Sequence, residues 1–93
     1  RSRHRIPTPA VSNALTRSVQ TIALEGPGIV EVTAIRARWL GHRVHAEVTV
    51  SVDAGLTVSS GHELAESVET ELIKAIPVLS GAAVHLHQAG AVL

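Results

Sequence analysis

The stretch that decides the fold is IVEVTAIRARWLGHRVHAEVTVSVD, residues 29–53. Its second half alternates apolar and polar residues without a break, which is typical of a strand with one dry and one wet face. The apolar set is Val44, Ala46, Val48, Val50 and Val52, and the polar set is His45, Glu47, Thr49, Ser51 and Asp53. The pattern therefore predicts a strand with one face in the core and the other toward water or a partner.

A second run with a strand-like period precedes the first, from Val30 to Leu40. Its alternation is less regular, but it still assigns the residues to two faces of a strand. One side holds Val30, Val32 and Ala34, and the other holds Thr33, Ile35, Ala37 and Trp39. Arg36 and Arg38 follow on the first side, so that end of the face must reach solvent or a carboxylate. Gly41-His42 supplies a turn between the two runs, which predicts a hairpin.

Apolar residues at helical spacing predict one helix on each side of this hairpin. In the first helix, Thr8 is the expected N-cap and Pro9 the first helical residue, and Gly26-Pro27-Gly28 is the stop signal. In the second helix, residues 59–76, Ser60-Gly61-His62-Glu63 has the spacing of a capping box. The expected buried stripes are Val11, Ala14, Leu15, Val19 and Ile22, then Leu64, Ala65, Val68, Leu72, Ala75 and Ile76. The remaining polar surface of the second helix includes Glu63, Glu66, Glu69 and Glu71, interpreted as solubilising.

Residues 82–88 alternate again and predict a third strand, so the order is helix, strand, strand, helix, strand. This order predicts an α+β domain over residues 9–88, with a linker or arm over residues 1–8 and a tail over residues 89–93. A right-handed crossover between strands of one sheet places both helices on one face of the three-stranded sheet. The other face stays uncovered, and such faces are usually covered by a second copy or decorated with polar residues.

Composition excludes several classes of function. Eight basic residues balance eight acidic ones, and there is no Phe or Tyr to stack on bases, so we expect no nucleic-acid partner. No run approaches the roughly 20 apolar residues of a spanning helix, and we expect the chain to be a segment of something longer. The N-terminal basic cluster, residues 1–5, is interpreted as a solvated tail or as a contact with anionic lipid headgroups. Trp39, the only aromatic residue, is interpreted as the rim of the core or as an anchor between subunits.

Six histidines in 93 residues are the chemical oddity of the chain. Cysteine is absent, so any metal site must be built from His and carboxylates. His85 and His87 lie two apart on a strand and point to the same side, which is a spacing that offers two imidazoles to one ion. His45 and Glu47 share their sheet face if the third strand lies beside the second. The alternative is that these are structural or surface histidines. No nucleophile elbow or phosphate loop is present, and we expect no enzyme.

Five features together carry a resemblance to a known family. They are Gly28-Ile29-Val30, Ile35-Arg36-Ala37-Arg38 with Gly41, the alternating strand to Asp53, His62 with Val68-Glu69, and Val84 to Gln88. In order and spacing this chain resembles the C-terminal cytoplasmic domain of cation diffusion facilitator transporters, over roughly residues 9–88.

The resemblance implies a ferredoxin-like, metallochaperone-like open-faced sandwich with a mixed sheet. It also implies a homodimer at the cytoplasmic face of the cell membrane, attached to a membrane-spanning part that performs proton-coupled efflux. The domain would sense Zn²⁺ or another divalent cation, which draws two copies together and biases the spanning helices.

Carried over residue by residue, the ligand set of the family is half present. His62, opening the second helix, and His87, closing the last strand, match family ligands. The other ligand positions hold Thr33, Thr49 and Ala89. Threonine is a poor Zn²⁺ ligand and alanine is none, so either the domain is a metal-independent dimerisation module or other residues complete a reduced site. The candidates for completing it are His85, His45 and Asp53. The expected ion contacts are His62 and His87, with His85 next.

Overall fold

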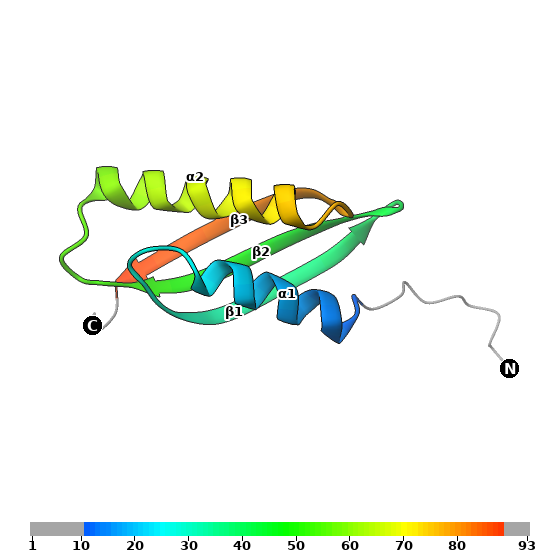
Figure 1. The fold of residues 1–93 in the computed structure, drawn as a ribbon, viewed down its shortest axis with the longest axis horizontal. Coiled ribbons are helices and arrows are strands. Elements are labelled where there is room, and N and C mark those ends of the chain that lie inside the picture. The colour runs from blue at the N-terminus through cyan, green and yellow to red at the C-terminus, as the bar shows by residue number, and fades with distance from the viewer. Residues whose placement is uncertain (1–10, 89–93) are drawn as a thin grey trace, which may run out of the picture.

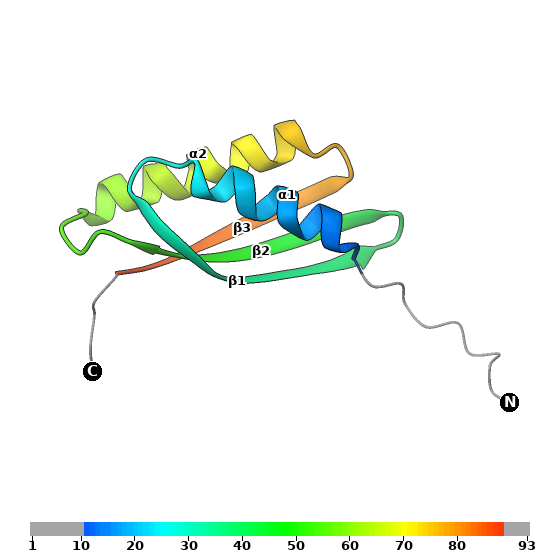
Figure 2. The same ribbon diagram turned by 60° about the horizontal axis from the view of Figure 1, so that its bottom comes forward.

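The computed structural model describes residues 11–88. The elements are, in order, α1 (Asn13–Leu24), β1 (Ile29–Leu40), β2 (Arg43–Val52), α2 (Val58–Ala75) and β3 (Leu79–Gln88). β2 is the central strand of one sheet, antiparallel to β1 and parallel to β3. Both helices lie on the same face of this sheet (Figures 1 and 2). The predicted α-β-β-α-β order, the mixed sheet and the one-sided helices are confirmed.

The helix-covered side of the sheet holds the core, and we call it the covered face. The apolar side chains of β2 are all buried there, at 0 to 2% exposure: Val44, Ala46, Val48, Val50 and Val52. Val19 and Ala23 of α1 and Leu64, Val68 and Leu72 of α2 are buried in the same cluster. Burial of this apolar surface is the main stabilising term of so small a domain. The unbroken alternation of β2 therefore predicted its buried face correctly.

The turn between β1 and β2 is the predicted one. Gly41 has φ +67°, and no residue other than glycine has a positive φ in the described part of the chain. A positive φ at the first central residue of a two-residue loop is the type II′ pattern, whose twist suits a hairpin. Glycine reaches this conformation without the steric cost that a Cβ brings.

β1 departs from simple alternation at two β-bulges. The register with β2 shifts between Ile29 and Glu31 and again between Val32 and Ala34. Each shift inserts one extra residue into β1, and an extra residue reverses the side on which the next residues point. Val32 consequently packs against the core cluster, on the same side as Ile35. The prediction that grouped Val32 with Val30 and Ala34 was wrong for this reason.

Both helices begin at caps other than those predicted. Ser12 is the N-cap of α1, and its side chain accepts a hydrogen bond from the Leu15 N–H at 3.1 Å. Ser12 is extended, so the helix does not start at residue 9, and Thr8 and Pro9 lie outside the described residues. Thr57 is the N-cap of α2 and accepts from the Ser60 N–H at 3.0 Å. Several residue types near a helix start can cap it, and only the backbone conformation decides which one does.

α2 packs closely on β3. A Cβ on Gly61 would meet the Leu86 side chain at 3.1 Å, so the missing side chain lets the helix approach the strand. Ala75, by contrast, is exposed, although the stripe pattern predicts that it is buried.

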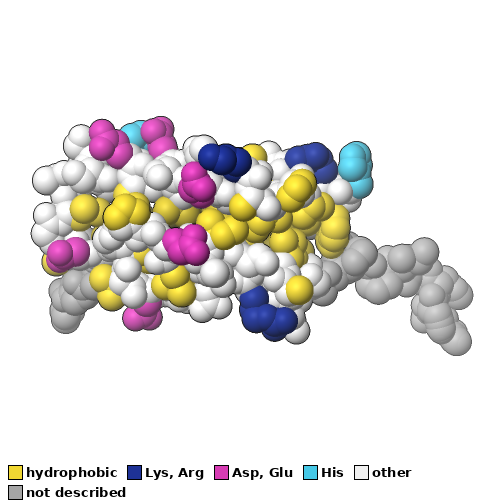
Figure 3. All heavy atoms as spheres, in the orientation of Figure 1, with side chains coloured by type: hydrophobic (Ala, Val, Ile, Leu, Met, Phe, Trp, Pro, Cys, Tyr) yellow, Lys and Arg dark blue, Asp and Glu magenta, His cyan; other side chains and the backbone are white. Residues whose placement is uncertain are grey.

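In the residues that the structure describes, no helix is long and apolar enough to cross a membrane. On the side drawn in Figure 3, acidic side chains lie over α2.

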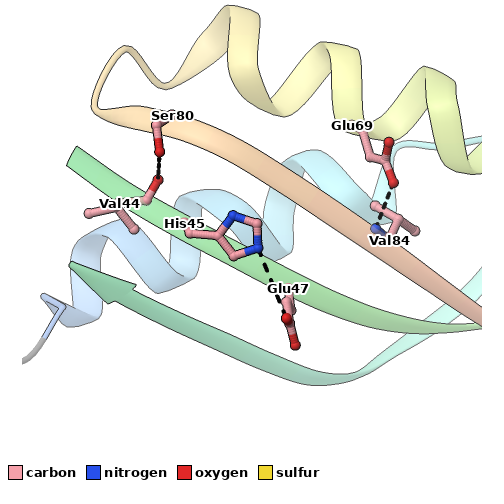
Figure 4. A network of polar contacts seen from close by, with 6 residues as sticks. All are labelled: Val44, His45, Glu47, Glu69, Ser80 and Val84. Atoms are coloured by element: carbon pink, nitrogen blue, oxygen red, sulfur yellow. Dashed lines mark hydrogen bonds and ion pairs between the residues drawn. The ribbon is translucent and has the colours of Figure 1, made fainter. Parts of the chain in front are cut away.

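One acidic residue of α2 has a structural role that the sequence did not indicate. Glu69 of α2 accepts a hydrogen bond from the Val84 N–H at 2.8 Å (Figure 4). β3 is an edge strand, and its outward N–H groups are a template for pairing with another chain. Glu69 therefore blocks one position of this edge.

Candidate functional site on the bare sheet face

The side of the sheet opposite the helices carries most of the polar candidates, and we call it the bare face. Cross-strand partners point to the same face of a sheet, so the register sorts these residues into rows across β1, β2 and β3. The rows are Arg38–His45–Gly81, Arg36–Glu47–Ala83, Ala34–Thr49–His85 and Glu31–Ser51–His87. The expectation that His45, Glu47, His85 and His87 share one face is confirmed.

His85 and His87 are both exposed and lie on neighbouring rows. The Nε2 atom of His87 is 3.2 Å from the Ser51 hydroxyl oxygen across the β2–β3 pair. Ser51 is only 5% exposed, so this contact holds the imidazole against the sheet. His85 lies beside Thr49 and has no side-chain hydrogen bond among the described residues. The two imidazoles therefore lie exposed on one surface, and only that of His87 has a side-chain hydrogen bond within residues 11–88.

His45 occupies the other end of the bare face. Its Nε2 atom lies 4.0 Å from a Glu47 carboxylate oxygen, at the limit of an ion pair (Figure 4). A Cβ on Gly81 would stand 3.2 Å from the His45 Nδ1 atom. The imidazole thus lies over a part of β3 that lacks a side chain. The row of His45 is three rows away from the row of His87, as their pairings with Gly81 and Ser51 show.

His62 belongs to the helix layer instead. It sits in the second turn of α2, is 73% exposed, and its Nε2 atom lies 3.2 Å from a Glu66 carboxylate oxygen. His85 and His87 face away from that layer. Within residues 11–88 no three His or carboxylate side chains are grouped so that they could hold a metal ion. A single copy of the domain therefore does not gather His62, His85 and His87 into one site, and their role as ion contacts stays a prediction.

Asp53, a predicted substitute ligand, and Thr33, which occupies a ligand position of the family, are both engaged in local hydrogen bonds. An Asp53 carboxylate oxygen accepts from the Gly55 N–H at 3.2 Å, which is the hydrogen bond of an Asx turn. The Thr33 hydroxyl donates to the Thr49 carbonyl at 3.2 Å, at the second bulge of β1. Both side chains stabilise backbone geometry at these positions. Neither joins the histidines of the bare face.

Glu31 is a candidate that the sequence reasoning missed. Simple alternation from Ile35 places Glu31 on the covered face, but the bulge at Thr33 turns it to the bare face. There it shares a row with Ser51 and His87. A charged residue in an otherwise apolar run was the only available signal, and it did not say which face the residue occupies.

Trp39 lies on the covered face opposite Val44, half-buried against the core cluster. Its interpretation as a rim-of-core residue is confirmed. The indole Nε1 atom is buried and has no hydrogen-bond partner within the described residues. Buried indole N–H groups usually find a partner, so the subunit-anchor interpretation stays a prediction.

Comparisons with known proteins agree with this architecture. A probable cation efflux system protein of Mycobacterium tuberculosis is 33% identical over 79 residues, which are 85% of this chain and 24% of that protein. The uncharacterized transporter YdbO of Bacillus subtilis is 45% identical over 38 residues, which are 41% of this chain and 13% of that protein. The matched part of this chain thus spans about a quarter of the length of the first relative, and a smaller share of the second.

Solved structures of similar fold include the MamM C-terminal domain. A variant in its nickel form has a TM-score of 0.79 and 27% identity, covering 83% of this chain and 98% of that chain. A variant in its cadmium form has a TM-score of 0.78 and 28% identity, covering 82% and 95%. A family profile described as "Cation efflux protein, cytoplasmic domain" matches residues 11–89. This chain belongs to the cation efflux protein family and matches its cytoplasmic domain.

Proposed function

We propose that this chain is the dimerising and regulatory domain of a divalent-cation efflux transporter, at the cytoplasmic face of the cell membrane. The observation that carries the metal part is the pair His85 and His87 on one bare sheet face. Membership of the cation efflux family carries the transport context. The role is one of binding and not of catalysis.

The histidine pair suits a borderline metal ion such as Zn²⁺. Neutral imidazole is a common Zn²⁺ ligand, and structural zinc sites take four ligands in most cases. One copy offers two imidazoles on this face, so a complete site needs further ligands from a second copy or from water. A two-fold axis near the bare face would bring four imidazoles together, because both copies present the same patch. Ser51 would act as an outer partner that fixes the His87 ring.

Regulation follows from the same arrangement. An ion bound by both copies interacts only with the paired state, so it shifts the population toward pairing. The attached membrane part would respond to the change in spacing. The nickel, cadmium and copper forms of MamM C-terminal domain variants support a divalent cation as ligand without selecting zinc. His62 with Glu66 would be a separate, exposed contact on α2.

Isothermal titration with Zn²⁺ tests the metal part directly. We expect wild-type binding to weaken by about tenfold or more in His87→Ala and in His85→Ala, since each removes half of the imidazoles. His42→Ala is the matched control, because His42 is an exposed histidine of the hairpin turn. His62→Ala reports whether α2 contributes. Wild-type chain that binds no Zn²⁺ would contradict sensing and leave pairing open.

A second candidate is a metal-independent pairing module. It is favoured by the lack of any three-ligand group within residues 11–88 and by the engagement of Thr33 with backbone. This function predicts a dimer in sedimentation velocity that a chelator does not dissociate. It also predicts a thermal midpoint that added Zn²⁺ does not raise, since only a ligand of the folded state shifts that midpoint.

A further inference from the structure

A shallow hollow lies at the hairpin end of the bare face. It has a volume of about 260 Å³ and is lined by Arg36, Ala37, Arg38, His45 and Glu47. We call it the arginine hollow. Of the four rows given above, its residues occupy the two nearer the turn, and His85 and His87 occupy the two farther from it. The hollow is therefore separate from the proposed ion contacts.

Positive charge predominates around the arginine hollow. Arg36 and Arg38 have no carboxylate oxygen within 4.0 Å among residues 11–88, where the ion pairs involve other side chains. Arg43, on the same strand end as His45, donates to the carbonyls of Pro77 at 3.1 Å and Leu79 at 2.8 Å. Its guanidinium is thus held in place without a carboxylate. Two guanidinium groups, those of Arg36 and Arg38, line the hollow with one carboxylate, Glu47, and this balance of charge favours an anion over a cation.

The arrangement of donors suits an anion with several oxygens. Arg36 and Arg38 alternate on one strand, so their side chains rise side by side from one face, roughly 7 Å apart at the backbone. Guanidinium groups bind phosphate through paired N–H donors. His45 lies directly opposite Arg38 and adds an imidazole to the same side. Because Gly81 has no side chain, the His45 ring can lie close over β3 at this end of the bare face.

We propose that the arginine hollow binds a small phosphate-bearing anion through Arg36, Arg38 and His45. Glu47 opposes such a ligand, because a carboxylate repels an anion at this range. Substitutions on the two neighbouring strands should therefore change the affinity for the anion in opposite directions. Loss of an arginine weakens binding, and neutralisation of Glu47 strengthens it. This proposal does not depend on the metal role of His85 and His87.

Titration of pyrophosphate into the ¹⁵N-labelled chain, followed by NMR, is the test. We expect saturable shifts at residues 36–38 and 45, and weakening by about tenfold or more in Arg38→Gln and Arg36→Gln. Arg17→Gln is the control, since Arg17 lies exposed on α1 and the change removes the same charge elsewhere. It should alter the affinity by less than about twofold. Glu47→Gln should raise the affinity.

A second arm identifies the source of the phosphate group. Co-sedimentation with phosphatidylglycerol vesicles is compared with phosphatidylcholine vesicles for wild type, Arg38→Gln and Arg17→Gln. Binding to phosphatidylglycerol that needs Arg38 but not Arg17 would assign the hollow to a lipid headgroup, and pyrophosphate binding alone would assign it to a soluble anion. Both results support the proposal. Absence of saturable binding in both arms, or equal losses in Arg17→Gln and Arg38→Gln, would overturn it.

Discussion

The two faces of β2 share one backbone and have different roles. On the covered face, five side chains are at most 2% exposed and pack under both helices. On the bare face, His45, Glu47 and Thr49 are only partly buried and make few contacts. Burial of apolar area stabilises the fold, whereas a polar face that neither described helix covers contributes little to it. The covered face thus specifies the structure and leaves the bare face free to carry binding chemistry.

The largest expected effect belongs to the covered side. Leu72→Ala removes a fully buried side chain and leaves a cavity, which should lower the free energy of unfolding by about 2–5 kcal/mol. The neighbouring Ile73→Ala is the matched control, because Ile73 is 43% exposed. Urea denaturation compares the two. Equal losses would contradict the assignment of Leu72 to the core.

A smaller effect is expected where a helix protects the edge of the sheet. Glu69→Ala leaves the part-buried Val84 N–H without its partner and should cost about 1–3 kcal/mol. The freed edge should also increase self-association. Denaturation and light scattering measure both, with Glu66→Ala on the same helix as control. A Glu69→Ala variant as stable as the control would show that the edge hydrogen bond contributes nothing.

The caps distinguish the structure from the sequence pattern. Thr57→Ala removes the side chain that accepts from the Ser60 N–H and should cost about 1 kcal/mol. Ser60→Ala should cost less, since the Ser60 side chain is not the cap. Thermal denaturation of the two variants ranks them. A larger loss of stability in Ser60→Ala than in Thr57→Ala would instead support the capping box predicted at Ser60.

The smallest effect on stability is expected on the bare face. Arg36→Gln should change the free energy of unfolding by no more than about 0.5 kcal/mol, because the side chain is exposed and has no ion pair within the described residues. Urea denaturation checks this value. A cost as large as that of Leu72→Ala would show that the bare face also holds the fold together.

Sequence alone predicted β2, the turn at Gly41 and the order of elements, because each follows from a local period or a local glycine. It failed at β1, where the bulge at Thr33 reverses the pointing direction of both Val32 and Glu31. A bulge is a property of the strand pair, so the periodicity of one strand cannot show it. The sequence also did not predict the hydrogen bond from the Val84 N–H to Glu69, because only the packing of α2 on β3 brings these two residues together.

The candidate site was predicted in part. The shared face of His45, His85 and His87 followed from alternation once the third strand was placed beside the second. The separation of His62 from that face did not follow from the sequence. His62 belongs to the helix layer, and the helix layer and the bare face lie on opposite sides of the sheet. Under the proposed function, the number of ligands gathered in one place depends on how two copies pair, and the periodicity of one chain does not indicate that geometry.

Sedimentation velocity of the chain with Zn²⁺ and with a chelator tests the role of the bare face most directly. We predict that Zn²⁺ raises the dimer fraction of wild type and leaves the doubly substituted His85→Ala/His87→Ala chain unchanged. A particle that stays monomeric at high concentration with Zn²⁺ present, or a dimer that responds equally in both proteins, would contradict the account.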